Sequence, residues 1–253
     1  MKRYLAICIL LGAANVALTD YKTLQSIAEE VNSLQTTWKA RTDFPTNTTA
    51  ASYKMLLGAR ESLHKPVYSL MTPVDAVSNI PEEFDARKHW PNCPISHIRD
   101  QGHCGSCWAV SSASVFSDRL CIASKGQFVM PLSEEELLTC CADCGDGCDG
   151  GSTISAWNYF EYHGIVTGGD YKSLIGCQPY SLSSEHKSLV GFASLGHLTN
   201  RRTPVCVKQC TNPLYDNPFE YDHHKVSNAY YVPSTESAIQ QEILAHGPVV
   251  GFF

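Results

Sequence analysis

The chain has 253 residues, of which 43% are hydrophobic and 17% are charged, and its formal net charge is −6. This composition is ordinary for a globular protein and argues against general disorder. A negative net charge provides no basic surface of the kind that attracts nucleic acids or anionic membranes, so we expect neither as a partner.

The first residues have the pattern of a secretory signal peptide. Lys2 and Arg3 precede an apolar run, Leu5 to Leu18, that contains several small residues. This run is shorter than the roughly 20 residues that a membrane-spanning helix needs. We therefore predict that residues 1–19 are removed, that no span anchors the chain, and that the protein enters the secretory pathway toward a lysosomal or extracellular location.

Secretion exposes cysteines to an oxidising compartment, in which disulfides form. The chain has 12 cysteines, and the loss of Cys8 with the signal leaves an odd number, so at least one thiol stays outside the intrachain disulfides. Cys107 is our candidate for that thiol. The cluster from Cys140 to Cys148 could instead bind zinc, but its spacing is not paired and its compartment favours disulfides. We expect no metal and no cofactor.

The stretch that follows the signal has the composition of an accessory segment. Apolar residues recur at helical spacing between residues 21 and 38, which predicts an amphipathic helix. Asn47 begins an N-glycosylation sequon. Prolines then recur between residues 66 and 81, as in an exposed connector. We expect residues 20–79 to be a removable pro-segment, although a helical lobe followed by a loop fits the composition equally.

Three helices are predicted in the next part of the chain. One begins near Ser106 and places Cys107 in its first turn, where unpaired N–H groups and the positive end of the helix dipole favour a thiolate. A second begins at a capping box formed by Ser133 and Glu136. A third runs over residues 154–162.

The last part of the chain contains one more predicted helix. Ser234 is the expected N-cap, and Gly247 followed by a proline ends the helix. Residues 249–253 then have the pattern of the start of a strand.

Three motifs together point to a family. The run Gln101 to Trp108 contains Cys-Gly-Ser-Cys-Trp, a pattern found around the nucleophile of papain-like enzymes. Residues 80–87 and 147–151 supply the other two motifs. The chain resembles the cathepsin B-like precursors of the papain-like cysteine proteases, from its signal to residue 253. The resemblance implies an α+β fold of two lobes within residues 80–253, with a helical left lobe and a β-rich right lobe that is incomplete.

The resemblance also implies roles for individual residues. Cys107 matches the nucleophile, and Gln101 matches the side-chain donor of the oxyanion hole. Gly150 and Gly151 match the backbone that holds an extended substrate, and Trp108 is expected among the substrate-binding residues. The expected partners are peptide or protein substrates and the chain's own pro-segment as an intramolecular inhibitor, and we expect a monomer.

A disulfide pairing follows from the resemblance and leaves Cys107 free, in agreement with the odd cysteine count. The implied pairs are Cys93 with Cys121, Cys104 with Cys148, Cys140 with Cys206, Cys141 with Cys144, and Cys177 with Cys210.

The chain departs from the family pattern at its general base. The family uses a histidine oriented by an asparagine, but none of the ten histidines is followed by alanine, as the family setting requires. His246 follows Cys107 at a distance in sequence that would suit such a base. However, a histidine in the last turn of a helix is already explained by its favourable interaction with the helix C-terminus. We expect the catalytic histidine and asparagine to lie beyond residue 253 and the chain as it stands to be inactive.

The long loop between Cys177 and Cys206 is a second departure. The resemblance implies an occluding loop with two adjacent histidines that bind the terminal carboxylate of a substrate. Here His186 is followed by Lys187. Carboxydipeptidase activity is therefore less expected than endopeptidase activity.

Our leading hypothesis is a lysosomal or secreted cysteine-type endopeptidase that acts through a thioester on Cys107. The alternative is a non-catalytic homologue that binds peptides or inhibits proteases. A disulfide-rich structural domain without a site is a third interpretation.

Overall fold

The computed structural model describes residues 24–34, 37–43, 54, 56–62, 80–182 and 202–252. The chain forms two compact units, Met1–Lys54 and Met55–Phe253. The expected signal peptide, the sequon at Asn47 and the loop residues His186 and Lys187 lie outside the described residues.

The first unit contains the helix α1 (Leu24–Ser33). This helix is shorter than the predicted one, and Trp38 lies beyond its end with 58% of its surface exposed. The reason lies at Asn32, whose side chain accepts a hydrogen bond from the Ala40 amide at 2.8 Å and donates one to the Ala40 carbonyl at 2.9 Å. These two bonds turn the chain back instead of extending the helix.

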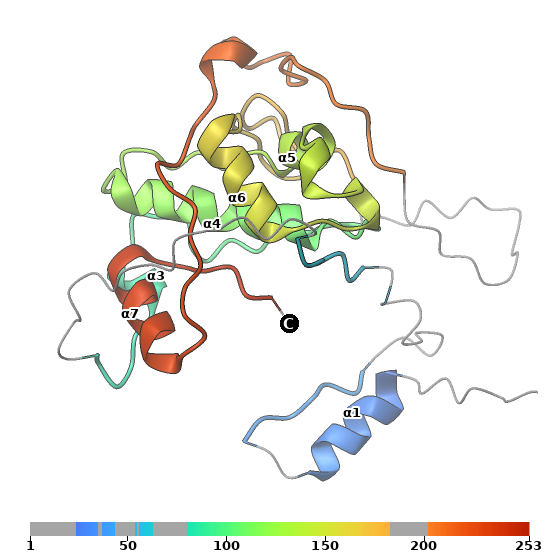
Figure 1. The fold of residues 1–253 in the computed structure, drawn as a ribbon, viewed down its shortest axis with the longest axis vertical. Helices are drawn as coiled ribbons and strands as arrows, with labels where there is room; N and C mark the ends of the chain where they lie inside the picture. Colours follow the sequence, from blue (N-terminus) through green and yellow to red (C-terminus); the bar gives the residue numbers. More distant parts are fainter. Residues whose placement is uncertain are drawn as a thin grey trace, which may run out of the picture. The chain divides into compact units, whose positions relative to one another are not determined.

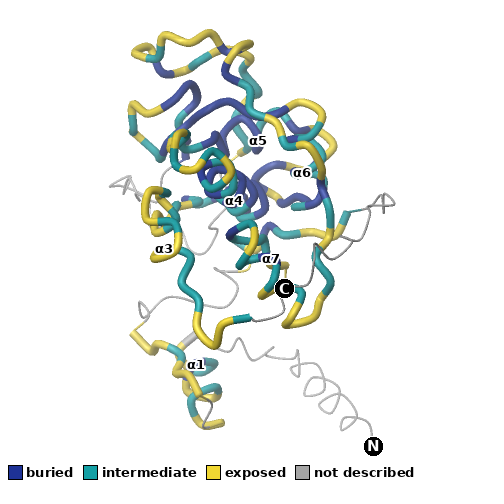
Figure 2. Tube along the Cα trace, turned by 90° about the vertical axis from the view of Figure 1, so that its left-hand side faces the viewer, coloured by how far each residue is buried: buried dark blue, intermediate teal, exposed yellow. Residues whose placement is uncertain are grey.

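Three helices form the core of the second unit. They are α4 (Cys107–Ala123), α5 (Glu134–Cys140) and α6 (Thr153–Tyr162), and they pack together in Figure 1. Figure 2 shows buried chain on these three helices and on the loops beside them. Large apolar side chains fill the space between them, among them Phe116, Leu137 and Phe160. Burial of such side chains supplies most of the stability of a fold.

Two further α-helices and three 3₁₀ helices surround this core. They are α3 (Ala86–His89), α7 (Glu236–His246) and the 3₁₀ helices η1 (Ala142–Cys144), η2 (Gly147–Asp149) and η3 (Phe219–Tyr221).

Side-chain caps explain where the helices begin. The Ser133 hydroxyl accepts a hydrogen bond from the Glu136 amide at 3.1 Å, as the capping box predicts. The reciprocal bond is absent, because the Glu136 carboxylate accepts from the Val166 amide at 2.7 Å instead. The predicted cap at Ser234 was wrong by one residue: Thr235 accepts from the Ala238 amide.

Extended pairing is sparse in the part of the chain that the structure describes. Isolated antiparallel bridges join Leu132 to Thr167 and Ile165 to His224. The described residues after 248 form no bridge, so the strand predicted from residue 249 is not observed there. A strand is defined by its partner, and none of the described segments pairs with these residues.

Five disulfides join the described segments, and their pairing is the one that the resemblance implies. Cys107 is the free cysteine among the described residues. The observed bridges are Cys93–Cys121, Cys104–Cys148, Cys140–Cys206, Cys141–Cys144 and Cys177–Cys210.

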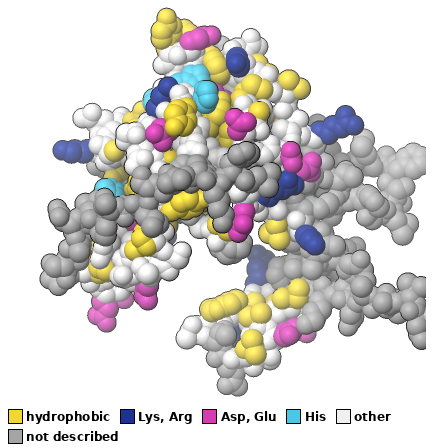
Figure 3. All heavy atoms as spheres, viewed as in Figure 1, with side chains coloured by type: hydrophobic (Ala, Val, Ile, Leu, Met, Phe, Trp, Pro, Cys, Tyr) yellow, Lys and Arg dark blue, Asp and Glu magenta, His cyan; other side chains and the backbone are white. Residues whose placement is uncertain are grey.

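The distribution of charged side chains on the surface agrees with the negative net charge of the chain. On the described part of the face in Figure 3, acidic and basic side chains are interspersed with hydrophobic ones and form no continuous basic area. Among the described helices, none has both the length and the apolar character required to cross a bilayer.

An ion pair ties the segment after residue 202 to the core. His223 Nε2 lies 3.0 Å from the carboxylate of Glu136, and its Nδ1 lies 3.0 Å from the carbonyl oxygen of Phe219. A proton on each ring nitrogen lets His223 donate to both of these acceptors. The hydrogen bond to Glu136 accordingly raises the pKa of His223, whereas burial lowers the pKa of the adjacent His224.

The two histidines should give stability opposite dependences on pH. His223 contributes fully below its ordinary pKa of 6.5, and its contribution is lost as pH rises through its raised pKa. We expect His223→Gln to remove about 1 kcal/mol of unfolding free energy at pH 6 and to abolish the loss of stability above pH 6.5. Urea unfolding at several pH values measures both effects.

His224→Gln is the matched control. Its lowered pKa makes the folded state lose stability as pH falls below 6.5, so this variant should keep the loss above pH 6.5 and lack the loss below it. A His223→Gln protein with an unchanged pH profile would contradict the assignment.

Candidate active site

The free thiol lies at the start of the central helix. Cys107 is the first residue of α4 and is half-buried, as the sequence predicts for the first turn. The Ser106 hydroxyl does not cap the helix but forms a hydrogen bond of 2.7 Å with the Tyr180 hydroxyl. No side-chain cap therefore covers the start of α4, and the positive end of the helix dipole favours an anion at Cys107.

Gln101 lies beside the thiol and donates both protons of its amide. Nε2 donates to the carbonyl oxygen of Cys104 at 2.7 Å and to that of Leu56 at 2.9 Å. The first bond orients the side chain toward the loop that precedes Cys107. The second shows that the amide can hold a peptide carbonyl, which is the interaction that an oxyanion-hole donor makes.

Gly150 and Gly151 form the other wall of the site. The Gly151 amide donates to the Gly58 carbonyl at 2.8 Å, and the Gly151 carbonyl accepts from the Arg60 amide at 2.9 Å. A side chain on either glycine would be obstructed: a Cβ on Gly151 would lie 2.6 Å from the Trp108 ring, and Gly150 has φ of +118°. This wall holds an extended chain through its backbone.

Trp108 is buried, contrary to our expectation of a substrate-binding side chain. Only 1% of its surface is exposed, and its Nε1 donates to the carbonyl of Gly147 at 3.0 Å. The ring supports Gly151 from inside the protein. The reason is geometric, because successive helical residues point about 100° apart and a neighbour of Cys107 therefore faces the core.

Residues 56–60 occupy the site. The Gly58 amide donates to the sulfur of Cys107 at 3.2 Å, and Ala59 forms a parallel bridge with Gly151. A Cβ on Gly58 would lie 1.7 Å from the Gly105 carbonyl oxygen, so glycine is required at this point. One feature of the sequence could have indicated this contact: Gly58 is the only glycine of residues 56–60.

Tyr180 is a further site residue that sequence reasoning missed. Its hydroxyl donates to the Gln101 carbonyl at 3.0 Å and accepts from Ser106 at 2.7 Å. Burial raises the pKa of Tyr180, so the hydroxyl stays protonated and remains a donor. No motif identifies this tyrosine, because it follows Cys107 by a long stretch of sequence.

His246 lies at the opposite end of α4 from Cys107. The next residue, Gly247, packs on Ile122, with its Cβ position 2.3 Å from that side chain. Ile122 is about 22 Å from Cys107 along the helix axis, at 1.5 Å per residue. This separation agrees with the expectation that His246 is not the base for Cys107.

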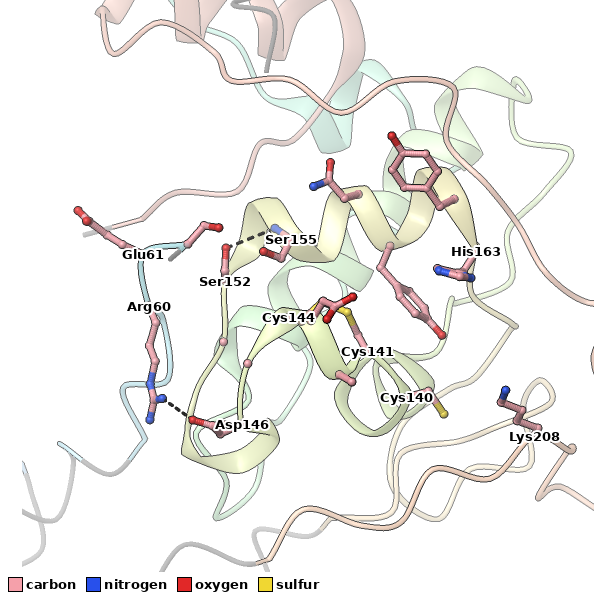
Figure 4. A pocket seen from close by; sticks show the side chains of 18 residues that line it. Arg60, Glu61, Cys140, Cys141, Cys144, Asp146, Ser152, Ser155, His163 and Lys208 are labelled. Atoms are coloured by element: carbon pink, nitrogen blue, oxygen red, sulfur yellow. Dashed lines mark hydrogen bonds and ion pairs between the residues drawn. A yellow bond between two sulfur atoms is a disulfide. The ribbon is translucent and has the colours of Figure 1, made fainter. Parts of the chain in front are cut away.

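A groove of about 940 Å³ extends from the glycine wall (Figure 4). Its walls come from the loop at residues 140–146, from one side of α6 and from residues 60–62. Within the described residues, no cluster of histidine, cysteine and carboxylate side chains could hold a metal ion. The side chains described above offer a thiol at the start of α4 and an amide that donates hydrogen bonds.

Tyr180→Phe should destabilise the protein by about 2 kcal/mol, because it leaves the Gln101 carbonyl and the Ser106 hydroxyl without their partner. Tyr162→Phe is the control, since Tyr162 is 69% exposed and should change stability by less than about 0.5 kcal/mol. Urea unfolding measures both variants. Equal stability of the two would show that the Tyr180 hydroxyl does not support the site.

Comparisons with known proteins agree with this geometry. The model of the papain family cysteine proteases matches residues 80–253. Cathepsin B-like cysteine proteinase 4 of Caenorhabditis elegans is 42% identical over 242 residues, which are 92% of this chain and 70% of that protein. A cathepsin B-like cysteine proteinase of Schistosoma japonicum is 40% identical over 79% of this chain and 59% of its own length.

Among solved structures, procathepsin B S9 of Trypanosoma congolense matches with a TM-score of 0.68 and 30% identity, over 87% of this chain and 68% of that one. This match extends the likeness from the motifs to the fold, including the expected papain-like α+β architecture. Together with the family match over residues 80–253, it shows that the chain belongs to the papain family of cysteine proteases, with cathepsin B-like proteinases among its relatives.

Proposed function

We propose that this protein is the precursor of a cathepsin B-like endopeptidase that cleaves peptide bonds through Cys107. The thiolate sulfur attacks the peptide carbonyl carbon, the C–N bond breaks, and the amine leaves with a proton. Water then hydrolyses the thioester and regenerates the thiol. One observation above all supports this proposal: Gln101 donates to a peptide carbonyl, that of Leu56, next to the half-buried thiol at the start of α4.

The charge that develops during this reaction has donors available. Attack converts the carbonyl into an oxyanion, and the Gln101 amide together with the Cys107 amide are the donors that we assign to it. Donors of this kind stabilise the transition state by about 3 kcal/mol each. The base that activates the thiol is, in our proposal, a histidine beyond residue 253, with an asparagine that orients it.

Residues 56–60 act as an internal inhibitor in this proposal. Their backbone occupies the Gln101 donor, the sulfur and the glycine wall at the same time. The sulfur faces the N–H of Gly58, whereas cleavage needs a carbonyl carbon at that place. The segment is therefore bound like a peptide but is not aligned for attack.

We propose removal of a signal at residues 1–19 and of a pro-segment at residues 20–79, and activity in a lysosomal or extracellular compartment. Peptides or proteins are the proposed substrates. His186 is followed by Lys187 and not by a second histidine, so we propose endopeptidase rather than carboxydipeptidase activity.

The nucleophile can be tested with a peptidyl epoxide that alkylates thiols. Mass spectrometry of the treated protein should find the label on Cys107, and Cys107→Ala should remove it. Label on another cysteine, or no label after residues 56–60 have been displaced, would contradict the enzyme proposal and favour a homologue that only binds peptides.

Gly58→Ala tests the internal inhibitor. The added methyl group cannot fit against Gly105, so the segment should leave the site and Cys107 should react with the epoxide several-fold faster. Leu57→Ala is the control, because the Leu57 side chain is 75% exposed and its loss should not change the rate. Equal rates for wild type and Gly58→Ala would contradict the inhibitory role.

A further inference from the structure

Two of the buried glutamates in the first turn of α5, Glu134 and Glu135, have no role in the proposed reaction. Burial raises the pKa of both carboxyls. Carboxyl groups are buried at a cost in free energy unless they bind a partner. The partners of these two side chains therefore indicate what the start of α5 holds in place.

Glu134 holds the segment that precedes Gln101. Its carboxylate forms an ion pair with the guanidinium of Arg99, and only 2% of the Glu134 side chain and 5% of the Arg99 side chain are exposed. Arg99 also donates to the Leu132 carbonyl at 2.9 Å and to the Ser117 hydroxyl at 3.0 Å. Both Nη atoms of the guanidinium are thus engaged, and Arg99 is fixed to the core two residues before Gln101.

A tight turn transmits this restraint to Gln101. The Asp100 carboxylate accepts a hydrogen bond from the Gly102 amide at 2.8 Å, and Gly102 has φ of +62°. Gln101 lies between these two residues, so the turn restrains its backbone from both sides. The direction of the Gln101 side chain therefore depends on where Arg99 anchors the turn.

Glu135 holds a second segment that reaches Gln101. Its carboxylate accepts hydrogen bonds from the Ser181 amide at 3.0 Å and from the Ser181 hydroxyl at 2.8 Å. The preceding residue is Tyr180, whose hydroxyl donates to the Gln101 carbonyl at 3.0 Å. The two segments that α5 holds through adjacent glutamates therefore meet at Gln101.

We propose that Glu134 and Glu135 are positioning residues for the oxyanion donor Gln101. Glu134 acts through Arg99, and Glu135 acts through the segment that contains Tyr180. This inference rests on the proposed peptidase function and adds to it two residues that act from inside the protein. A donor stabilises an oxyanion only when it is already aimed at the oxygen, and a misplacement of about 1 Å can cost a large factor in rate.

Two ligands that differ in one group measure the donor without requiring turnover. One is a peptidyl aldehyde, and the other is the corresponding peptidyl alcohol. The Cys107 sulfur adds to the aldehyde carbon, and the carbonyl oxygen takes up the thiol proton and becomes the hydroxyl of a hemithioacetal. Gln101 can donate to that oxygen, whereas the alcohol forms no bond to sulfur. Both ligands must displace residues 56–60, so the cost of displacement cancels in the ratio of their affinities.

This aldehyde-to-alcohol ratio should fall when the support is removed. Gln101→Ala measures the complete loss of the donor, which we expect to lower the ratio about tenfold. Arg99→Met combined with Glu134→Leu removes the ion pair without leaving a buried charge unpaired, and proteins often tolerate such a replacement. We expect this combination to lower the ratio about threefold or more, and to have no further effect when Gln101→Ala is already present.

Glu135→Gln tests the second segment and does not depend on the stability of the first variant. Glutamine keeps one acceptor oxygen, so one of the two hydrogen bonds from Ser181 is lost and the other is retained. The ratio should fall about twofold, again only in a protein that has Gln101. An unchanged ratio would contradict the role of Glu135.

A buried ion pair elsewhere in the chain provides the matched control. Arg119 lies 2.8 Å from Glu242, and this pair joins α4 to α7. Arg119→Met combined with Glu242→Leu should keep the ratio, even where urea unfolding shows an equal loss of stability. The inference would be overturned by an equal fall in this control, by an unchanged ratio after substitution of Arg99 and Glu134, or by a fall that persists without Gln101.

Failure of the proposed function gives a different result, because the wild type would then bind the aldehyde no more tightly than the alcohol. In that case NMR of the ¹⁵N-labelled protein decides on the positioning. The side-chain amide resonances of Gln101 are identified by their absence in Gln101→Ala. Substitution of Arg99 with Glu134 should shift them, and the control at Arg119 and Glu242 should not. Unshifted resonances would overturn the inference.

Discussion

The disulfide between Cys104 and Cys148 is the constraint on which the rest of the site depends. It joins the loop before α4 to the loop that contains the glycine wall, two segments that are far apart in sequence. The Gly105 amide strengthens the junction through a hydrogen bond of 2.8 Å to the Cys148 carbonyl. The thiol at the start of α4 and the backbone that holds a peptide are thereby fixed to one another, and such fixed geometry is what catalysis by preorganised groups requires.

Buried side chains support the site from inside the protein. The buried Trp108 ring lies against Gly151, and Tyr180 connects the Gln101 backbone to Ser106. Each contact comes from a residue that never reaches the groove. The wall beside Cys107 is backbone, because Gly150 and Gly151 leave no room for side chains.

The sequence predicted the parts of the site that follow from local chemistry. The helix at Cys107 and the end of α7 were predicted from caps and spacing, and the odd cysteine count singled out a free thiol. The disulfide partners required the family resemblance, because the cysteine count alone allows many pairings.

The predicted role of Trp108 was wrong, because adjacency to a nucleophile does not say which face of a helix is buried. Tyr180 and Arg60 were missed, because their partners are distant in sequence and periodicity describes only a residue's own element.

Thiol mapping by mass spectrometry tests the central claim most directly, namely that the disulfide frame leaves Cys107 as the reactive thiol of the mature fold. The protein is alkylated in its native state, unfolded without reduction, alkylated with a second reagent, and digested. The account predicts five disulfides with the observed pairing and alkylation of Cys107 as the single thiol of residues 80–253. A disulfide that includes Cys107, or a free thiol at Cys104 or Cys148, would contradict it.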